Sequence, residues 1–107
     1  MINQDDIKKK QATIQEDIAN HKIVLYMKGH KTMPMCGFSG QVIHILNQIG
    51  VPFETRNVLE DEVLREAIKV FSDWPTIPQL YVNGEFIGGC DIIIELYESG
   101  DLMTQLA

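Results

Sequence analysis

The sequence predicts an α/β fold: one mixed four-stranded sheet with helices on both faces. Helix-spaced apolar residues alternate with short β-branched or aromatic runs along the 107 residues. The first β-α-β unit predicts two parallel strands, because its crossover is right-handed and returns the chain in the same direction. Asn83-Gly84 then predicts an antiparallel hairpin, because this dipeptide supplies the two positive φ values of a tight turn.

Three local signals set the boundaries of the elements. Apolar residues three and four apart indicate helices, and continuous or alternating apolar runs indicate strands. Glycines suited to a left-handed cap indicate helix ends, as at Gly50 and Gly100. In order, these signals give a helix ending near residue 20, a strand at 23–27, a loop at 28–35, a helix at 36–49, a strand at 53–58, a helix at 63–71, strands at 79–82 and 85–87, a helix from about residue 90, and a short helical tail from residue 101.

Composition limits the classes of function. The length predicts one domain, residues 1–107, with an N-terminal helix at 1–21 and a core at 22–107. A net charge of −6 has the wrong sign for a nucleic-acid partner, and the longest apolar run is far below the roughly 20 residues that span a bilayer. Two cysteines and no secretory signal predict a reducing compartment, the cytoplasm, with an organelle matrix as the alternative.

The segment Cys36-Gly37-Phe38-Ser39 is the most informative one. A Cys-x-x-Cys pair at this place would indicate a dithiol site that closes its own disulfide. Because Ser39 occupies the fourth position, Cys36 must react with, or bind, something brought from elsewhere. The thiol begins a predicted helix, whose free N–H groups and dipole favour the thiolate, and Lys28 would add positive charge. The thiolate is both the nucleophile and the metal-binding form, so this placement serves either chemistry.

Two later segments supply further candidate site residues. Ile77-Pro78 precedes a strand, where a cis bond would turn the main chain toward a ligand, and spacing leaves cis and trans open. Cys90-Asp91 follows two glycines at a helix start, where backbone N–H groups can hold a carboxylate. Cys90 is expected to be a bystander or to bind through its main chain. A disulfide from Cys90 to Cys36 is the alternative.

Other conspicuous side chains are interpreted as structural. Trp74 is the single tryptophan and is expected in the core. Met33 and Met35 flank a proline and are expected to pack within the loop. The three histidines follow no spacing that would build a metal site with the cysteines.

These motifs make the chain similar to the monothiol glutaredoxins with a Cys-Gly-Phe-Ser active site. The resemblance covers about residues 23–102 and implies a single glutaredoxin domain whose core, 22–107, has the thioredoxin-like fold. The chain departs from the family at His30-Lys31, where a small hydroxyl residue and a proline are more usual. The local charge and the stiffness of the loop near Cys36 are therefore left open. The motifs that carry it are Tyr26-Met27-Lys28-Gly29, Pro34-Met35-Cys36-Gly37-Phe38-Ser39, Trp74-Pro75-Thr76-Ile77-Pro78-Gln79-Leu80-Tyr81-Val82 and Gly84-Glu85-Phe86-Ile87-Gly88-Gly89-Cys90-Asp91.

The resemblance also implies a groove that holds glutathione beside the thiol. Its basic residues face the glycine carboxylate, the main chain before a cis proline pairs with the cysteinyl unit, and the start of the last helix holds the γ-glutamyl end. The glutathione-binding residues that it implies are Lys28, Arg65, Ile77, Pro78, Cys90 and Asp91, with Lys69 assisting.

Such proteins typically bind a 2Fe–2S cluster, which needs four ligands. Two chains each giving Cys36, with two bound glutathiones, reach four without Cys90. The leading hypothesis is therefore a glutathione-dependent cluster scaffold or carrier, bridging a homodimer and delivering to apo iron–sulfur proteins. The family suggests a BolA-like partner. The alternatives are a glutathione-dependent thiol–disulfide oxidoreductase acting on glutathionylated proteins, and a redox sensor that closes Cys36 to Cys90.

Overall fold

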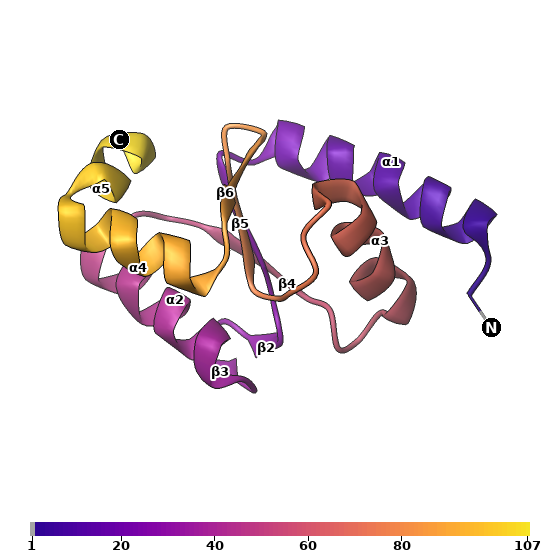
Figure 1. Cartoon of the computed structure of the whole chain (residues 1–107), viewed down its shortest axis with the longest axis horizontal. Helices are drawn as coiled ribbons and strands as arrows, with labels where there is room; N and C mark the ends of the chain where they lie inside the picture. Colours follow the sequence, from indigo (N-terminus) through magenta and orange to yellow (C-terminus); the bar gives the residue numbers. More distant parts are fainter. Residues whose placement is uncertain (1) are drawn as a thin grey trace.

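The predicted four-stranded mixed sheet is confirmed in the computed structural model, which describes residues 2–107 (Figure 1). The strands lie in the order β4-β1-β5-β6, with β1 parallel to β4 and antiparallel to β5, and β5 antiparallel to β6. All five residues of β1 are buried, because this strand has neighbours on both sides and helices over both faces. The strands are β1 (Ile23–Met27), β4 (Glu54–Asn57), β5 (Gln79–Val82) and β6 (Glu85–Gly88).

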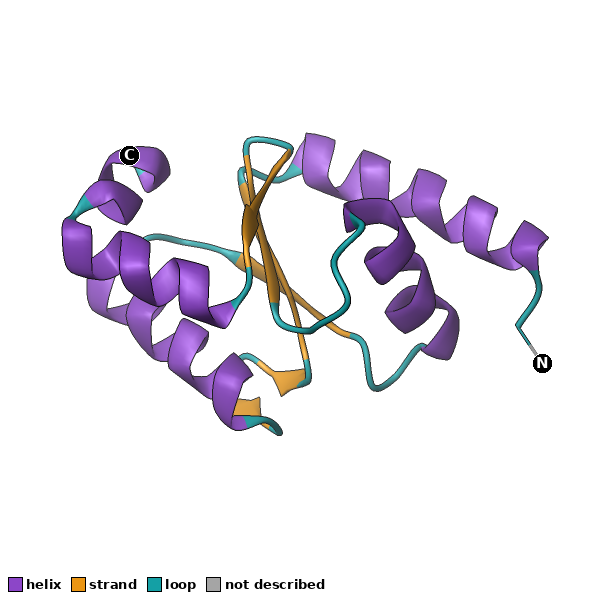
Figure 2. Cartoon of the chain, viewed as in Figure 1, coloured by secondary structure: helices purple, strands orange, loops and turns teal. Residues whose placement is uncertain are grey.

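Helices cover both faces of the sheet, as the apolar pattern predicts (Figure 2). Successive residues of a strand point to opposite faces. Val24 and Tyr26 therefore join the core under α1 and α3, whereas Leu25 and Met27 join the core under α2, α4 and α5. Within residues 2–107, no helix has both the length and the apolar composition that crossing a membrane requires. The helices are α1 (Gln4–Asn20), α2 (Gly37–Ile49), α3 (Glu62–Ser72), α4 (Cys90–Ser99) and α5 (Asp101–Leu106).

The predicted turn and caps are confirmed. Asn83 and Gly84 have φ values of 53° and 80°, as the tight hairpin between β5 and β6 requires. Gly50 and Gly100 end α2 and α4 in the left-handed conformation. α1 begins after Asn3, whose side-chain Oδ1 accepts a hydrogen bond at 2.9 Å from the backbone N–H of Asp6 in the first helix turn. The N-terminal helix predicted at residues 1–21 includes Met1, which lies outside the described residues.

The prediction of a loop at residues 28–35 is wrong in one respect, because this segment contains a hairpin. Two very short strands, β2 (Gly29–His30) and β3 (Met33–Pro34), pair antiparallel as a separate two-stranded sheet. Two residues per strand are too few to leave an alternating pattern in the sequence, so this element gave no periodic signal. The hairpin leads directly into Cys36 and thereby sets how the chain approaches the thiol.

Candidate functional site

Cys36 is the N-cap residue of α2, and its side chain is partly exposed. Ser39 lies in the same helix turn but is completely buried. Its Oγ accepts a hydrogen bond from the Lys28 backbone N–H at 3.1 Å. The hydroxyl thus joins the end of β1 to the start of α2, while the thiol lies at the surface.

The pKa of the Cys36 thiol is lowered from its ordinary value. Partial burial is the largest single effect and opposes ionisation, but the lowering effects together outweigh it, led by the backbone N–H groups of Ser39 and Phe38. The charge of Lys28 and the hydroxyl of Ser39 act in the same direction. The effects predicted for the helix start and for Lys28 are therefore confirmed. The site favours the thiolate, which is the reactive and metal-binding form.

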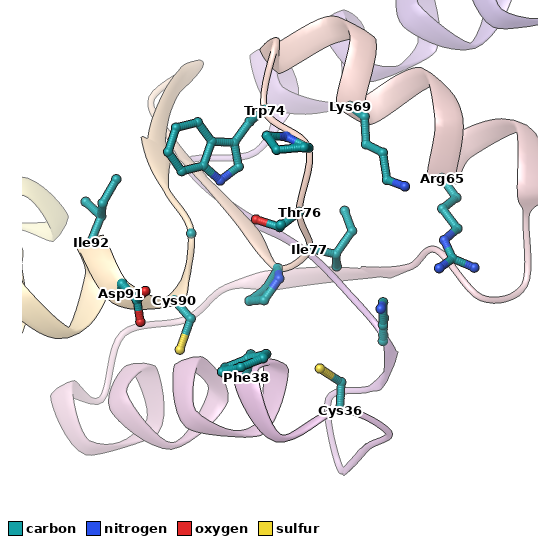
Figure 3. A pocket seen from close by; sticks show the side chains of 14 residues that line it. Cys36, Phe38, Arg65, Lys69, Trp74, Thr76, Ile77, Cys90, Asp91 and Ile92 are labelled. Atoms are coloured by element: carbon teal, nitrogen blue, oxygen red, sulfur yellow. The ribbon is translucent and has the colours of Figure 1, made fainter.

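A cavity of about 450 Å³ opens beside Cys36 (Figure 3). Its walls come from the end of β1, the start of α2, α3, the loop before β5, and the start of α4. Its volume is in the range of small-molecule sites, roughly 300–1,000 Å³. The lining residues are Lys28, Cys36, Phe38, Arg65, Lys69, Trp74, Pro75, Thr76, Ile77, Pro78, Gly89, Cys90, Asp91 and Ile92.

The structure brings together the thiol and every residue that the resemblance assigns to glutathione, since all of them line this cavity. Figure 3 places Arg65 and Lys69 at one end and Cys90 and Asp91 at the other, with Ile77 between them. Lys28 adds a third basic side chain, against one acidic residue in the described lining. The cavity is therefore locally basic in a chain whose net charge is −6.

The loop at residues 74–78 forms one wall of the cavity, and it corrects one prediction. Trp74 is not in the core: it is 37% exposed, lines the cavity and packs its ring on Phe86 with centroids 5.9 Å apart. The bond between Ile77 and Pro78 is cis, as the resemblance implies. Sequence analysis missed Gln79, which is completely buried beneath this loop and hydrogen-bonded to it.

Cys90 lies at the first position of α4 and is buried. Its Sγ–H donates to Oε1 of Gln41 at 3.1 Å, a contact that the sequence did not predict. Burial, followed by the charges of Asp91 and Cys36, raises the pKa of the Cys90 thiol. Both cysteines are free thiols in this structure. The two thiols thus share a cavity, with opposite tendencies to ionise.

The hairpin before Cys36 is held against the segment around β4 by side chains that sequence analysis missed. Gly29 donates its backbone N–H to Oδ1 of Asn57 at 2.9 Å. Lys31 donates from Nζ to the Phe53 carbonyl at 2.9 Å, and its Nζ lies 4.0 Å from the centroid of the Phe53 ring. Tertiary contacts made by Gly29 and Lys31 therefore hold this loop.

Backbone geometry also fixes this hairpin at Gly29. Its φ is 99°, and a Cβ atom there would lie 2.5 Å from the Met35 backbone nitrogen and 2.7 Å from the Met33 carbonyl oxygen. The backbone N–H of Met35 donates to the Lys28 carbonyl at 2.9 Å. A side chain at this position would push the two arms of the hairpin apart.

The surface around the thiol is apolar. Met33, Met35 and Phe38 are 68%, 65% and 59% exposed, so the prediction that the two methionines pack within the loop is wrong. The hairpin is too short to enclose its own side chains and directs them to solvent. All three residues lie within three positions of Cys36, so a molecule that reaches the thiol meets an apolar surface.

Comparison with known proteins identifies the family. The sequence profile of the glutaredoxin family matches residues 23–87. A curated relative from Rickettsia typhi, called a probable monothiol glutaredoxin 2, is 60% identical over 93 residues, which are 87% of this chain and 84% of the relative. The chain belongs to the monothiol glutaredoxins. The family predicted from the residues around Cys36 is therefore confirmed.

Solved structures of other glutaredoxins share the fold of this one. The solution structure of reduced apo GrxS14 from poplar is 52% identical, with a TM-score of 0.79, covering 89% of this chain and 87% of that one. A buckwheat glutaredoxin–glutathione complex has a TM-score of 0.88 at 21% identity, covering 98% of this chain and 94% of that one. The second likeness concerns the fold alone. The thioredoxin-like fold that the resemblance implied is thereby confirmed.

Proposed function

We propose that this glutaredoxin binds glutathione in the cavity beside Cys36 and uses it to carry a 2Fe–2S cluster to apo iron–sulfur proteins. The single observation that carries the proposal is the partly exposed Cys36 thiol, with its lowered pKa, at the mouth of a basic cavity of about 450 Å³. The role suits a reducing compartment such as the cytoplasm, where thiols stay reduced.

The charge and shape of the cavity support glutathione as the ligand. Glutathione is a short peptide with a carboxylate at each end. Lys28 and Arg65, with Lys69 beside them, would bind the glycine carboxylate, and the backbone N–H groups at the start of α4 would bind the γ-glutamyl carboxylate. The fold shared with the buckwheat glutaredoxin–glutathione complex adds support, because that protein holds glutathione on the same scaffold.

Ligand number supports a shared cluster. Within residues 2–107, no group of three or more His, Cys, Asp and Glu side chains could hold a metal ion. A 2Fe–2S cluster takes four ligands, usually thiolates. Cys36 supplies one thiolate, bound glutathione a second, and an identical pair from a second copy completes the set. The exposed apolar side chains of Met33, Met35 and Phe38 would lie against that second copy.

Anaerobic reconstitution with ferrous iron, sulfide and glutathione tests the proposal, with visible absorbance and size-exclusion chromatography as readouts. The wild type is expected to give a coloured dimer, and omission of glutathione a colourless monomer. Cys36→Ser should remain colourless. Cys90→Ser is the matched comparison and should colour, because the Cys90 thiol is buried and donates to Gln41. Loss of colour in Cys90→Ser would contradict the ligand assignment.

The lowered pKa of Cys36 also favours a second function, a glutathione-dependent oxidoreductase. In that reaction the Cys36 thiolate attacks the glutathione sulfur of a glutathionylated protein and releases the protein thiol. A second glutathione thiolate then attacks the Cys36 mixed disulfide, giving oxidised glutathione and free Cys36. Rapid turnover of a glutathionylated peptide by cluster-free protein would favour this function over the carrier.

A further inference from the structure

Gln79 is a fully buried polar residue, and its side-chain amide donates hydrogen bonds to the loop at residues 74–78. It lies at the start of β5, and none of its side chain is exposed. Nε2 donates to the Trp74 carbonyl at 3.1 Å and to the Thr76 carbonyl at 3.2 Å. Both amide hydrogens are thereby used on the two carbonyls that flank Pro75. The loop lies outside helices and strands, so these bonds replace the regular pairing that it lacks.

The orientation of the Gln79 amide is fixed from the other side. The Tyr81 hydroxyl donates to Oε1 of Gln79 at 3.1 Å, so a flipped amide would place its oxygen against two carbonyl oxygens. Tyr81 is itself held by aromatic neighbours, with ring centroids 5.6 Å from Tyr26 and 5.4 Å from Phe86. The buried aromatic core therefore fixes the position of the Tyr81 ring. The Tyr81 hydroxyl fixes the orientation of the Gln79 amide, and that amide holds the loop.

All five residues at 74–78 line the cavity, whereas Gln79 does not. The loop stands across the cavity from Phe38 and Cys36 in Figure 3. A ligand in the cavity would meet the main chain of this loop, and its affinity would depend on where the loop is held.

We propose that Gln79 is a positioning residue for glutathione: without touching the ligand, it holds the loop at 74–78 in the conformation that binds the tripeptide. The inference rests on the proposed glutathione site. It is separate from thiol activation, because the groups that lower the pKa of Cys36 belong to α2 and Lys28 and not to this loop. Loss of the Gln79 amide therefore weakens glutathione binding and leaves thiol reactivity unchanged.

Gln79→Met tests this role, because methionine fills a similar volume and cannot form these hydrogen bonds. Calorimetry with reduced glutathione is expected to give a dissociation constant roughly tenfold higher than that of the wild type. The rate of Cys36 alkylation by iodoacetamide should stay within about twofold. Gln48→Met, an exposed site on α2, is the matched control and should change neither quantity. Unchanged glutathione affinity in folded Gln79→Met, or an equal loss of affinity and alkylation, would overturn the proposal.

Gln79→Glu gives a readout that a purely structural role would not produce. A protonated carboxyl still donates one hydrogen bond to the loop, whereas a carboxylate donates none and repels both carbonyls. The titratable group that contacts it, Tyr81, has its pKa raised to about 12 by burial and stays protonated. Between pH 5.5 and 8.5, the ratio of the Gln79→Glu to the wild-type dissociation constant should rise severalfold, while the ratio for Gln79→Met stays flat. A flat ratio near one for Gln79→Glu would contradict the inference.

A ligand-free measurement separates this inference from the proposed function. Trp74, the single tryptophan, is on the loop, so its fluorescence reports the loop directly. Acrylamide should quench Trp74 more strongly in Gln79→Met than in the wild type or Gln48→Met. If the wild type fails to bind glutathione, the proposed function fails, and the quenching still decides whether Gln79 holds the loop. Equal quenching in all three proteins would show that it does not.

Discussion

The two walls of the cavity are held in different ways. The wall that carries the thiol is formed by the β2–β3 hairpin and the start of α2. Its backbone is hydrogen-bonded to Asn57 and to the buried Ser39. The long side chains of its hairpin make exposed contacts instead: Lys31 is exposed, and the contact from His30 to Glu60 at 3.2 Å joins two side chains that are 60% and 64% exposed. The opposite wall, residues 74–78, is fixed from beneath by the completely buried Gln79.

This difference determines how much each contact contributes. Leaving a buried hydrogen-bonding group without its partner costs about 1–3 kcal/mol, whereas an exposed ion pair contributes about 0–1 kcal/mol. We therefore expect the loop wall to be set rigidly by the core, and the thiol wall to be set chiefly by its backbone. The side chains of the hairpin can then vary in sequence without moving the loop at 74–78.

Gly29→Ala should give the largest effect on the thiol wall. Its Cβ would lie 2.5 Å from a backbone nitrogen at a φ of 99°, and backbone cannot move aside as a flexible side chain can. We expect a loss of at least about 2 kcal/mol in the free energy of unfolding, measured in urea. Gly37→Ala on the same wall is the control and should change stability by less than about 0.5 kcal/mol, because nothing lies within 4 Å of its added Cβ. Equal losses of stability in the two variants would mean that the hairpin backbone does not hold this wall in place.

Lys28→Met should slow Cys36 alkylation roughly threefold at pH 7. Removing this charge raises the pKa of the Cys36 thiol, because Lys28 is one of the groups that lower it. The thiolate fraction falls, and the midpoint of the rate–pH profile moves to higher pH. Lys22→Met removes an equal charge from an exposed site outside the cavity lining and should leave the profile unchanged. A profile that does not move in Lys28→Met would place thiol activation entirely in the helix start.

Lys31→Met should lower the free energy of unfolding by about 1 kcal/mol, because it removes one hydrogen bond and one cation–π contact at an exposed site. Lys31→Arg should retain most of that stability, because guanidinium also stacks on aromatic rings. Urea unfolding of both variants checks this. A loss as large as that of Gly29→Ala would break the comparison, since an exposed side chain would then matter as much as the backbone.

Glu60→Gln should have the smallest effect, within about 0.5 kcal/mol of the wild type at pH 7. Both partners of its contact with His30 are more than half exposed, so water competes for each of them. Thermal unfolding in low and high salt checks the result, since an ion pair that contributed would lose stability as salt rises. A salt-dependent loss above about 1 kcal/mol would show that exposed charges, and not the backbone, hold this wall in place.

The sequence by itself determined much of this protein because its signals are local. Apolar periodicity, the caps at Gly50 and Gly100, and the turn at Asn83-Gly84 each depend on neighbouring residues, and the sheet and helices followed from them. The position of Cys36 at the start of a helix likewise predicted a lowered thiol pKa, since the responsible N–H groups lie two and three residues away. The resemblance added residues that the structure brings to one cavity.

Only the tertiary structure decided what holds that cavity in place. Gln79 looks like any strand residue until its burial under the loop is seen, and Lys31 meets Phe53 across 22 positions of sequence. Trp74 was expected in the core and lies at the cavity instead, because it belongs to the loop that forms one cavity wall. Contacts between residues far apart in the chain depend on how the elements pack, and packing leaves no periodic trace in any one segment.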